Sequence, residues 1–337
     1  MAVTQRYRSR LTTVLTLIGV AVGLGNVWRF PYMMGSYGGS AFLLIYLIFT
    51  LCFAIPALIA ELSLGRHTRS STVPAFTRAI RHPWGRRIGF LLLASVFIAG
   101  SYYAVVVGNV VFSAFFSVTK GFGQTSTHVY GTQLSNGWLQ YGVAALVIIA
   151  ACFVIDRGLR RGIEVISKFF VPLFLATIIY LIVFVLGLPG AADQLLAFLR
   201  PDFADLTSQN VFAALGQAFY SVGLGGTFIV AYGSYLGEKE SIPRIALMTG
   251  AGDVSASLLV SLFLVPTILI FGLDMEAGPG LIFDTLPQLF QVMPSGRITG
   301  SLFLLVLSLV AFLSLVAAYE VVAGSVSAIT RWPRRYI

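Results

Sequence analysis

The chain has little charge for its length. Of its 337 residues only 10% are Asp, Glu, Lys or Arg, whereas 57% are hydrophobic. With a mean hydropathy of +0.89, too little polar surface is left to cover a soluble globule of this size. A helix needs about 20 apolar residues to cross a bilayer, and roughly eight stretches meet that length. We therefore expect an all-α membrane protein embedded in the lipid bilayer.

Cysteine and histidine are also scarce, and their positions exclude several functions. Cys52 and Cys152 each lie inside an apolar run, which suits neither a disulfide framework nor a zinc site. His67, His82 and His128 fall in expected loops, and the sequence has no His-Glu-x-x-His or Gly-x-Ser-x-Gly motif. An enzyme is therefore not expected. A channel is not expected either, because a few scattered charges do not line a pore.

The basic residues predict the topology. No cleavable signal segment precedes the first apolar stretch. Eighteen Lys and Arg residues fall at the N-terminus, after the second, fourth and sixth spans, and at the C-terminal Arg331, Arg334 and Arg335, whereas the opposite loops hold only Lys120, Arg200 and Arg297. By the positive-inside rule both termini are expected on the cytoplasmic side of a plasma membrane, which in a bacterium is the inner membrane. This explains the net charge of +9 without nucleic-acid binding. The eight spans are expected at 11–35, 40–64, 88–117, 137–156, 163–189, 209–236, 244–272 and 299–329.

Two of the expected spans carry the same glycine-rich interruption. The tetrapeptide Val-Gly-Leu-Gly occurs at 22–25 in the first span and at 222–225 in the sixth. One interpretation is close packing of two helix backbones. The other follows from their matched positions in two five-helix halves, because such paired interruptions indicate the binding site of a transporter. Unwound backbone N–H groups favour an anion there, and freed carbonyls favour a cation.

Four ionisable residues lie inside otherwise apolar spans. Each charge costs about 3 kcal/mol unless it faces protein or water, so Arg29, Glu61, Asp253 and Glu320 are functional candidates. Glu61 and Glu320 also fit a structural role as partners of nearby polar groups, and Arg29 fits either an interfacial anchor or a gate charge. Asp253 lies among small residues, and a carboxylate in that setting suits a hard cation such as sodium.

The motifs together resemble one transporter family. The segment from Arg10 to Arg66, with Val-Gly-Leu-Gly-Asn-Val-Trp-Arg-Phe-Pro at 22–31, is similar to the opening of the neurotransmitter:sodium symporters. Ser-Tyr-Tyr at 101–103, Arg-Gly-Ile-Glu at 161–164 and Gly-Gln-Ala-Phe-Tyr-Ser at 216–221 continue the likeness. The resemblance implies a leucine-transporter-type inverted-repeat helix bundle with helices 1 and 6 broken at midplane. It would form one transmembrane domain over 1–337, with a first five-helix repeat at 11–189 and an incomplete second repeat at 209–329.

The family resemblance implies sodium-coupled symport of an amino acid into the cell by alternating access, with one or two sodium ions. The first sodium site would use Ala21, Asn26, Ser221 and Asp253 together with the substrate carboxylate. Asp253 stands where many members have asparagine, so its charge predicts chloride independence, although Ser257 keeps a chloride site conceivable. The second sodium site would use the residues Gly19, Val22, Val310 and Ser314. Leu313 replaces a hydroxyl residue there, and shifting the alignment by one position still removes one hydroxyl.

The same resemblance implies a substrate pocket. The backbone near Leu24 and Gly25 and the Tyr103 hydroxyl would hold a carboxylate. Amine transporters of the family carry an acidic residue where this chain has Gly23, so an amino acid is favoured over an amine. Small residues in the pocket favour an apolar or aromatic side chain. Tyr102 and Tyr103 also fit simple packing roles. The pocket would be lined by Ala21, Gly23, Ala99, Tyr220, Ser221, Gly223, Gly226, Ser314 and Ala318, with Arg29 and Gln217 as the near half of an outer gate.

Several family features are not found in the sequence. The family core has ten helices, but only eight are expected here, and the acidic partner expected opposite Arg29 would lie on a later helix. Ala328 stands near the position of an inner-gate carboxylate, and Tyr7 replaces a tryptophan. A truncated reading frame is the simplest expectation. The alternative function is therefore a non-transporting fragment, or a membrane protein that binds sodium and amino acid without transport.

Overall fold

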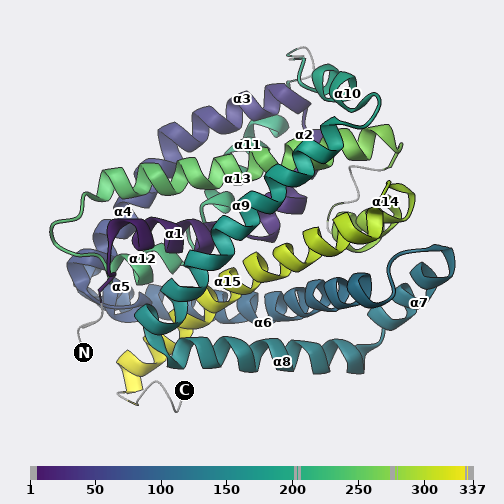
Figure 1. Cartoon of the computed structure of the whole chain (residues 1–337). Helices are drawn as coiled ribbons and strands as arrows, with labels where there is room; N and C mark the ends of the chain where they lie inside the picture. The colour runs from purple at the N-terminus through teal and green to yellow at the C-terminus, as the bar shows by residue number, and fades with distance from the viewer. Residues whose placement is uncertain are drawn as a thin grey trace.

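The computed structural model describes residues 6–200, 203, 206–273, 278, 280–330 and 332, and these residues form helices and connecting turns without any strand (Figure 1). The start of α1, the end of α15 and α5 lie at one end of the bundle, called the terminal end below, and α7, α10 and α14 lie at the opposite end. In chain order the helices are α1 Arg10–Ala21, η1 Gly25–Arg29, α2 Phe30–Ser36, α3 Gly39–Phe49, η2 Thr50–Ala54, α4 Ile55–Thr68, α5 Thr72–Ile80, α6 Pro83–Thr119, α7 Gln124–Leu134, α8 Gly137–Asp156, η3 Leu159–Ile163, α9 Glu164–Leu186, α10 Ala191–Phe198, α11 Ser208–Ser221, α12 Phe228–Gly233, α13 Ile242–Ile270, η4 Leu281–Thr285, α14 Leu286–Val292 and α15 Gly296–Thr330.

Eight helical segments match the eight expected spans. Among the described residues, six continuous helices are long and apolar enough to cross a membrane, and α1 with η1–α2 makes a seventh span bent by 62°. The remaining segment is α11–α12, which occupies the expected sixth span but is not among these seven, and it is interrupted between Ser221 and Phe228. The expected interruptions of the first and sixth spans are therefore confirmed. The sequence analysis missed four short helices, α5, α7, α10 and α14, because each is too short to cross a bilayer and lies in an expected loop.

The long helices divide into an inner and an outer set. In their most apolar windows α13 is 61% buried and α15 is 67% buried, whereas α6 and α8 are each only 22% buried. The outer helices expose large apolar side chains such as Phe97, Leu146 and Phe153. In water such a surface would drive aggregation, but in a bilayer it meets lipid of the same polarity. The inner helices α13 and α15 therefore form the protein core around which the site is built.

Helix contacts inside the bundle depend on small residues, because lipid removes most of the hydrophobic advantage of burial. The clearest case is the approach of α4 to α12. A Cβ atom added to Gly65 would lie 2.0 Å from the Val230 carbonyl oxygen, and one added to Gly233 would lie 2.8 Å from the Leu62 carbonyl oxygen. The two backbones thus touch at a reciprocal pair of glycines. Between α6 and α15, hydroxyls join the helices, with Ser117 Oγ 3.0 Å from Ser301 Oγ.

Of the four wide, π-helical turns in the described part of the chain, three stand directly before a proline. Phe30, Ile55 and Leu286 each donate a backbone hydrogen bond five residues back, and the next residue is Pro31, Pro56 or Pro287. Proline has no N–H, and its ring collides with the carbonyl four residues earlier in a regular α-helix. One extra residue in the turn moves that carbonyl away. The wide turns thus let the spans continue through these prolines.

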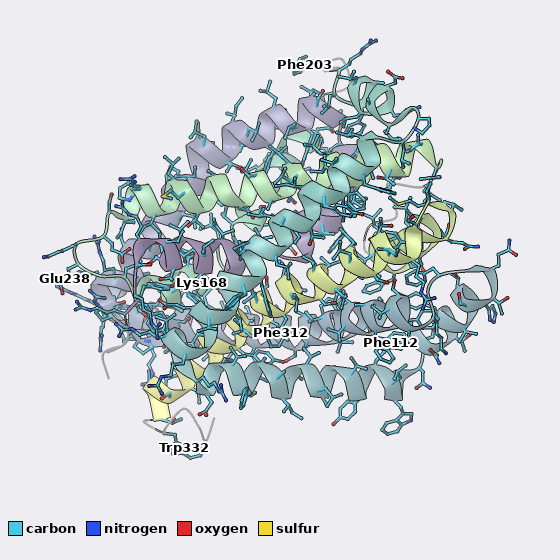
Figure 2. All side chains as sticks on the ribbon, in the orientation of Figure 1. Phe112, Lys168, Phe203, Glu238, Phe312 and Trp332 are labelled. Atoms are coloured by element: carbon cyan, nitrogen blue, oxygen red, sulfur yellow. The ribbon has the colours of Figure 1, made fainter. Side chains whose placement is uncertain are left out.

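Basic side chains gather at the terminal end, where Figure 2 shows many nitrogen atoms near Glu238. At the opposite end Arg297 donates to the carbonyl oxygens of Val118 and Thr119, each at 3.0 Å, and so caps α6. Arg331, Arg334 and Arg335 lie outside the described residues. The side of the membrane on which the terminal end lies stays a prediction.

The glycine contact between α4 and α12 gives a first prediction. Gly65→Ala should lower the free energy of unfolding by about 1–3 kcal/mol, because its new methyl group overlaps backbone that has little room to move. Thermal unfolding in detergent, followed by loss of the monodisperse peak, measures this. Gly142→Ala is the matched control, because nothing lies within 4 Å of a Cβ there and alanine is the better helix former by about 1 kcal/mol. Equal melting temperatures for the two variants would contradict the assigned contact.

Candidate functional site

The two helix breaks face one cavity of about 450 Å³. The first break separates α1 from η1, and the second separates α11 from α12, while α6 and α15 complete the wall. All twelve residues expected around the substrate line this cavity, which are Ala21, Gly23, Leu24, Gly25, Ala99, Tyr103, Tyr220, Ser221, Gly223, Gly226, Ser314 and Ala318.

The first break is stabilised by the side chain of Asn26, which follows it in the same span. Val22 is extended, with φ −70° and ψ 122°, and it ends α1. The freed Gly23 N–H donates to Asn26 Oδ1 at 2.8 Å, so this buried donor is satisfied. A Cβ atom at Gly23 would lie 2.8 Å from Ser314 Oγ and 3.4 Å from the Tyr103 hydroxyl oxygen. Glycine is therefore needed here for the close approach of α6 and α15.

The second break is held by a side chain from another helix. Gly223, Gly225 and Thr227 have φ of 72°, 81° and 56°, the left-handed values that end a helix. The Gly225 N–H donates to Glu61 Oε1 on α4 at 3.1 Å. Of the two roles considered for Glu61, the structure shows the structural one, because its carboxylate takes up a backbone donor that the break leaves free.

Aromatic rings fill the space that the glycines leave. A Cβ atom at Gly25 would lie 2.6 Å from Tyr220 Cε1, and one at Gly226 would lie 2.0 Å from Phe228 Cε2. Phe228 also lines the cavity, together with Ser95 of α6. The sequence analysis named neither residue. Ser95 was open to prediction, because it precedes Ala99 by four residues and so shares its helix face.

A polar cluster lies beside the cavity around Asp253, which is fully buried. Asn26 Nδ2 donates to Asp253 Oδ1 at 2.7 Å and to Ser257 Oγ at 2.8 Å, and Ser221 Oγ donates to Asp253 Oδ2 at 2.6 Å. Three of the four residues expected at the first sodium site are thus in direct contact, and Ala21 lines the adjoining cavity. No group of three or more His, Cys, Asp or Glu side chains converges in the described part of the chain. A donor set of amide, hydroxyl and one carboxylate oxygen suits a hard monovalent cation better than a transition metal.

The residues expected at the second sodium site are only partly brought together. Ser314 Oγ lies 3.1 Å from the Val22 carbonyl oxygen and 3.5 Å from that of Val20. A Cβ atom on Gly19 would lie 3.2 Å from Leu313 Cδ1, so an apolar methyl group faces this glycine. Val310 lies one turn before Ser314 on α15 and is buried. Of the four residues expected at this site only Ser314 carries a hydroxyl, and the second sodium site stays a prediction.

The charged residue beyond the first break contacts Tyr220, which lines the cavity. The Arg29 guanidinium donates to Gln217 and lies 4.4 Å from the centroid of the Tyr220 ring. No carboxylate among the described residues forms an ion pair with Arg29. A cation above an aromatic face is attracted to it, which orients both groups over the site. The contact with Tyr220, a residue of the cavity wall, is compatible with the gate role, which stays a prediction.

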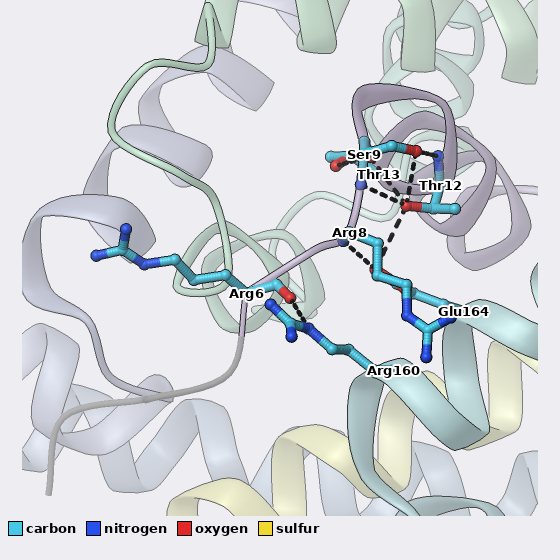
Figure 3. Close-up of polar contacts among 7 residues, drawn as sticks. All are labelled: Arg6, Arg8, Ser9, Thr12, Thr13, Arg160 and Glu164. Atoms are coloured by element: carbon cyan, nitrogen blue, oxygen red, sulfur yellow. Dashed lines mark hydrogen bonds and ion pairs between the residues drawn. The ribbon is translucent and has the colours of Figure 1, made fainter.

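At the terminal end the N-terminal segment is fastened to α9 (Figure 3). The buried Glu164 accepts from the Arg8 backbone N–H at 3.0 Å and from Thr12 Oγ1 at 3.4 Å, while Arg160 Nε donates to the Arg6 carbonyl at 2.7 Å. The sequence analysis quoted Glu164 as part of a motif but gave it no role. Its partners lie more than 150 residues away, so no local pattern indicates them.

Two further contacts close the same end. Tyr7 packs edge-on against Tyr235, with ring centroids 6.2 Å apart. Burial, together with nearby Tyr232 and Tyr235, raises the pKa of the Tyr7 phenol well above its usual range, so the hydroxyl stays neutral. Tyr235 donates to Glu320 of α15. Glu320 therefore has the structural role that the sequence left open, as an acceptor within the bundle.

Comparison with known proteins identifies this architecture. The chain matches the model of the sodium:neurotransmitter symporter family over residues 4–134 and 131–335. The uncharacterized sodium-dependent transporter YhdH of Bacillus subtilis is 31% identical over 95% of this chain and 72% of its own length. A similar transporter of Haemophilus influenzae is 30% identical, with coverage of 94% and 73%. The sodium- and chloride-dependent GABA transporter ine of Drosophila melanogaster is 27% identical, with coverage of 99% and 40%.

A solved structure agrees with the sequence relatives. The crystal structure of MhsT in complex with L-phenylalanine superposes with a TM-score of 0.89 at 32% identity, covering 99% of this chain and 77% of MhsT. The family match spans almost the whole sequence, and the paired helix breaks are those expected for such a fold. The chain therefore belongs to the sodium:neurotransmitter symporter family, and it is a sodium-dependent transporter rather than an enzyme.

Proposed function

We propose that this transporter carries an amino acid with an apolar or aromatic side chain into the cell, coupled to sodium, by alternating access. The observation that carries the proposal is the shared wall between the cavity and the Asp253 cluster, because Asn26 and Ser221 belong to both. A ligand in the cavity and a cation at Asp253 would therefore bind next to each other. The terminal end, which holds most of the basic residues, would face the cytoplasm.

The polar end of the cavity suits a carboxylate. Leu24 and Gly25 lie at the N-terminal start of η1–α2, where backbone N–H groups favour an anion. The Tyr103 hydroxyl lies next to the Leu24 backbone and is a donor of the right kind. At Gly23 the chain offers no acidic group that would pair with an amine ligand. These features support an amino acid over a biogenic amine.

The apolar part of the cavity wall suits a large apolar side chain. Ala99, Ala318 and Gly226 have small side chains or none and so leave space in the cavity. The rings of Tyr220 and Phe228 supply flat apolar surfaces. Aromatic groups stack favourably on such rings in offset or edge-to-face geometry. That MhsT, at 32% identity, was crystallised with L-phenylalanine supports the same class of substrate.

Asn26 can couple the two binding events. Its Oδ1 accepts from the Gly23 N–H, and its Nδ2 faces Asp253. A cation at Asp253 requires an oxygen in place of Nδ2, so the amide would turn its Oδ1 toward the ion. The Gly23 N–H would then lose its acceptor, and a substrate carboxylate could accept its hydrogen bond instead. Sodium and substrate would thus favour each other's binding, as reciprocal coupling requires.

The ion sites support two finer proposals. Asp253 brings a fixed negative charge next to the first sodium site, so transport would not need chloride. The second site has one hydroxyl and faces the Leu313 methyl group. Fewer oxygen ligands weaken the binding of a hard cation. We therefore expect one tightly bound sodium ion and a second that binds weakly.

The direct test is binding of labelled amino acids to the purified chain. Sodium chloride, sodium gluconate and potassium chloride are compared in parallel, on protein shown to be helical and monodisperse. We expect phenylalanine, tryptophan or leucine to bind in both sodium salts and not in potassium. Uptake into proteoliposomes then separates transport from binding alone. Amino-acid binding that is equal in sodium and potassium, or that is lost when chloride is replaced by gluconate, would contradict the proposal.

Asp253→Asn tests the charge at the first ion site. The variant keeps the shape but removes a buried charge that pairs with the cation, so sodium affinity should fall by about 30-fold or more. A response to chloride that the variant gains and the wild-type protein lacks would be a second sign of the same effect. Ser257→Ala is the matched control, because it removes a neighbour of Asn26 without changing charge. Unchanged sodium affinity in Asp253→Asn, with no chloride effect, would refute the assigned role.

Gly23→Asp tests the pose of the substrate. Its carboxylate would face that of the ligand, so amino-acid binding should fall below detection. A Cβ at this position would lie 2.8 Å from Ser314 Oγ, so any side chain is crowded there. Gly23→Asn introduces a side chain of the same size as aspartate without its charge, and so separates the effect of charge from that of crowding. We expect the asparagine variant to bind weakly and the aspartate variant not at all. Equal binding by both variants would show that the carboxylate lies elsewhere.

A further inference from the structure

A basic recess lies at the terminal end and shares no lining residue with the cavity between the breaks. It forms where α5 turns into α6, and its volume is about 670 Å³. Three arginines, Arg81, Arg86 and Arg87, line it together with His82, Thr77 and Phe90. Neither the proposed transport cycle nor the N-terminal contacts with Glu164 use any of these side chains.

Among the described residues, no acidic side chain forms an ion pair with the arginines of this recess. From Leu62 to Ile155 the sequence has no Asp or Glu. The ion pairs of the described residues involve Arg6, Arg8 and Arg69, and none involves an arginine of the recess. The unbalanced guanidinium groups would therefore attract an anion.

Aromatic rings hold two of the guanidinium groups in place. Arg86 lies 5.6 Å from the centroid of the Phe90 ring, and Arg87 lies 4.9 Å from that of Trp84. Such stacking fixes the plane of the group but leaves its N–H donors free. Donors arranged in a fixed fork are well suited to the oxygens of a phosphate.

The backbone beneath the recess is rigid. A Cβ atom at Gly85 would lie 2.6 Å from the Phe76 carbonyl oxygen, and one at Gly89 would lie 2.8 Å from Val73 Cα. The first turns of α6 are therefore pressed against α5. His82 caps α6 by accepting from the Trp84 N–H at 3.3 Å, so the positive end of this 37-residue helix opens beside the arginines.

The recess adjoins an apolar surface that extends along the same helix. Trp84 is 57% exposed and Leu91 is 68% exposed, and Ile88 and Phe90 are also exposed. Tryptophan next to arginine, followed by exposed apolar residues, is typical of the boundary between headgroups and acyl chains. A lipid would meet both surfaces at once, whereas a free phosphate would use only the first.

We propose that this recess binds the phosphate of an anionic phospholipid of the phosphatidylglycerol type, with the acyl chains along the exposed face of α6. Basic pockets beside membrane helices recognise such headgroups through the same chemistry. The site is independent of the proposed substrate and goes beyond transport itself. It would tie α5 and the start of α6 to the leaflet at the terminal end.

A first experiment maps the contact on the unmodified protein. Phosphatidylglycerol that carries a diazirine is crosslinked to the protein in nanodiscs, and the adducts are located by mass spectrometry. We expect adducts concentrated between Thr77 and Leu91, and far fewer there with the phosphatidylcholine analogue. The same adduct pattern for both lipids, or no adduct in this segment, would overturn the proposal.

A second experiment compares variants that remove equal charge. The test variant Arg81→Gln/Arg86→Gln/Arg87→Gln should lose about 100-fold in affinity for phosphatidylglycerol, measured by native mass spectrometry, because each arginine near the surface contributes to binding. The control Arg157→Gln/Lys239→Gln/Arg244→Gln removes three charges elsewhere, one of them also stacked on an aromatic ring. It should keep wild-type affinity within about threefold. Equal losses would show unspecific attraction and refute the site.

A third arm identifies the source of the phosphate. Inorganic phosphate replaces the lipid in a thermal-unfolding assay on wild-type protein in neutral detergent. Phosphatidylglycerol should raise the melting temperature, and inorganic phosphate at the same concentration should not. A shift with inorganic phosphate that the test variant lacks would overturn the lipid assignment in favour of a site for a free anion.

Discussion

Everything about this site depends on backbone hydrogen bonds that two broken helices must satisfy inside a membrane. An unpaired N–H in hydrocarbon costs several kcal/mol, so a helix does not unwind there without a replacement partner. The chain supplies two such partners, Asn26 for Gly23 and Glu61 for Gly225. These two contacts stabilise both breaks from within the protein. The cavity between them is a stable feature of the fold, and the glycines that create it also let α6 and α15 approach.

The sequence allowed much of this architecture to be predicted, for identifiable reasons. Apolar length alone gave the eight spans, and the repeated Val-Gly-Leu-Gly gave both breaks. The family motifs gave the residues that line the cavity. The contacts of Glu164 and the positions of Phe228 and Ser95 were not predicted. Glu164 acts through residues more than 150 positions away, Phe228 follows the break in an irregular backbone, and Ser95 required the helix face to be extended by one turn.

The same side chain often serves two neighbouring groups in this structure. Asn26 accepts from the Gly23 N–H and donates to Asp253. The Ser314 hydroxyl donates to the Val22 carbonyl and also lies where a side chain on Gly23 would be placed. In a bilayer this sharing is economical, because each buried polar atom must find a partner within the protein. It also means that a ligand at one site changes the partners available at the other. Coupling can then arise from hydrogen bonds that are exchanged over a few ångströms.

The wide helical turns before Pro31, Pro56 and Pro287 have an evolutionary consequence. Each turn contains one residue more than a regular helix needs, and that residue moves away the carbonyl with which the proline ring would otherwise collide. Deleting the extra residue alone would press the proline ring against a carbonyl and rotate the rest of the span by about 100°. The clash arises only while the proline is present. We therefore expect the extra residue to be lost in evolution only together with its proline or after it.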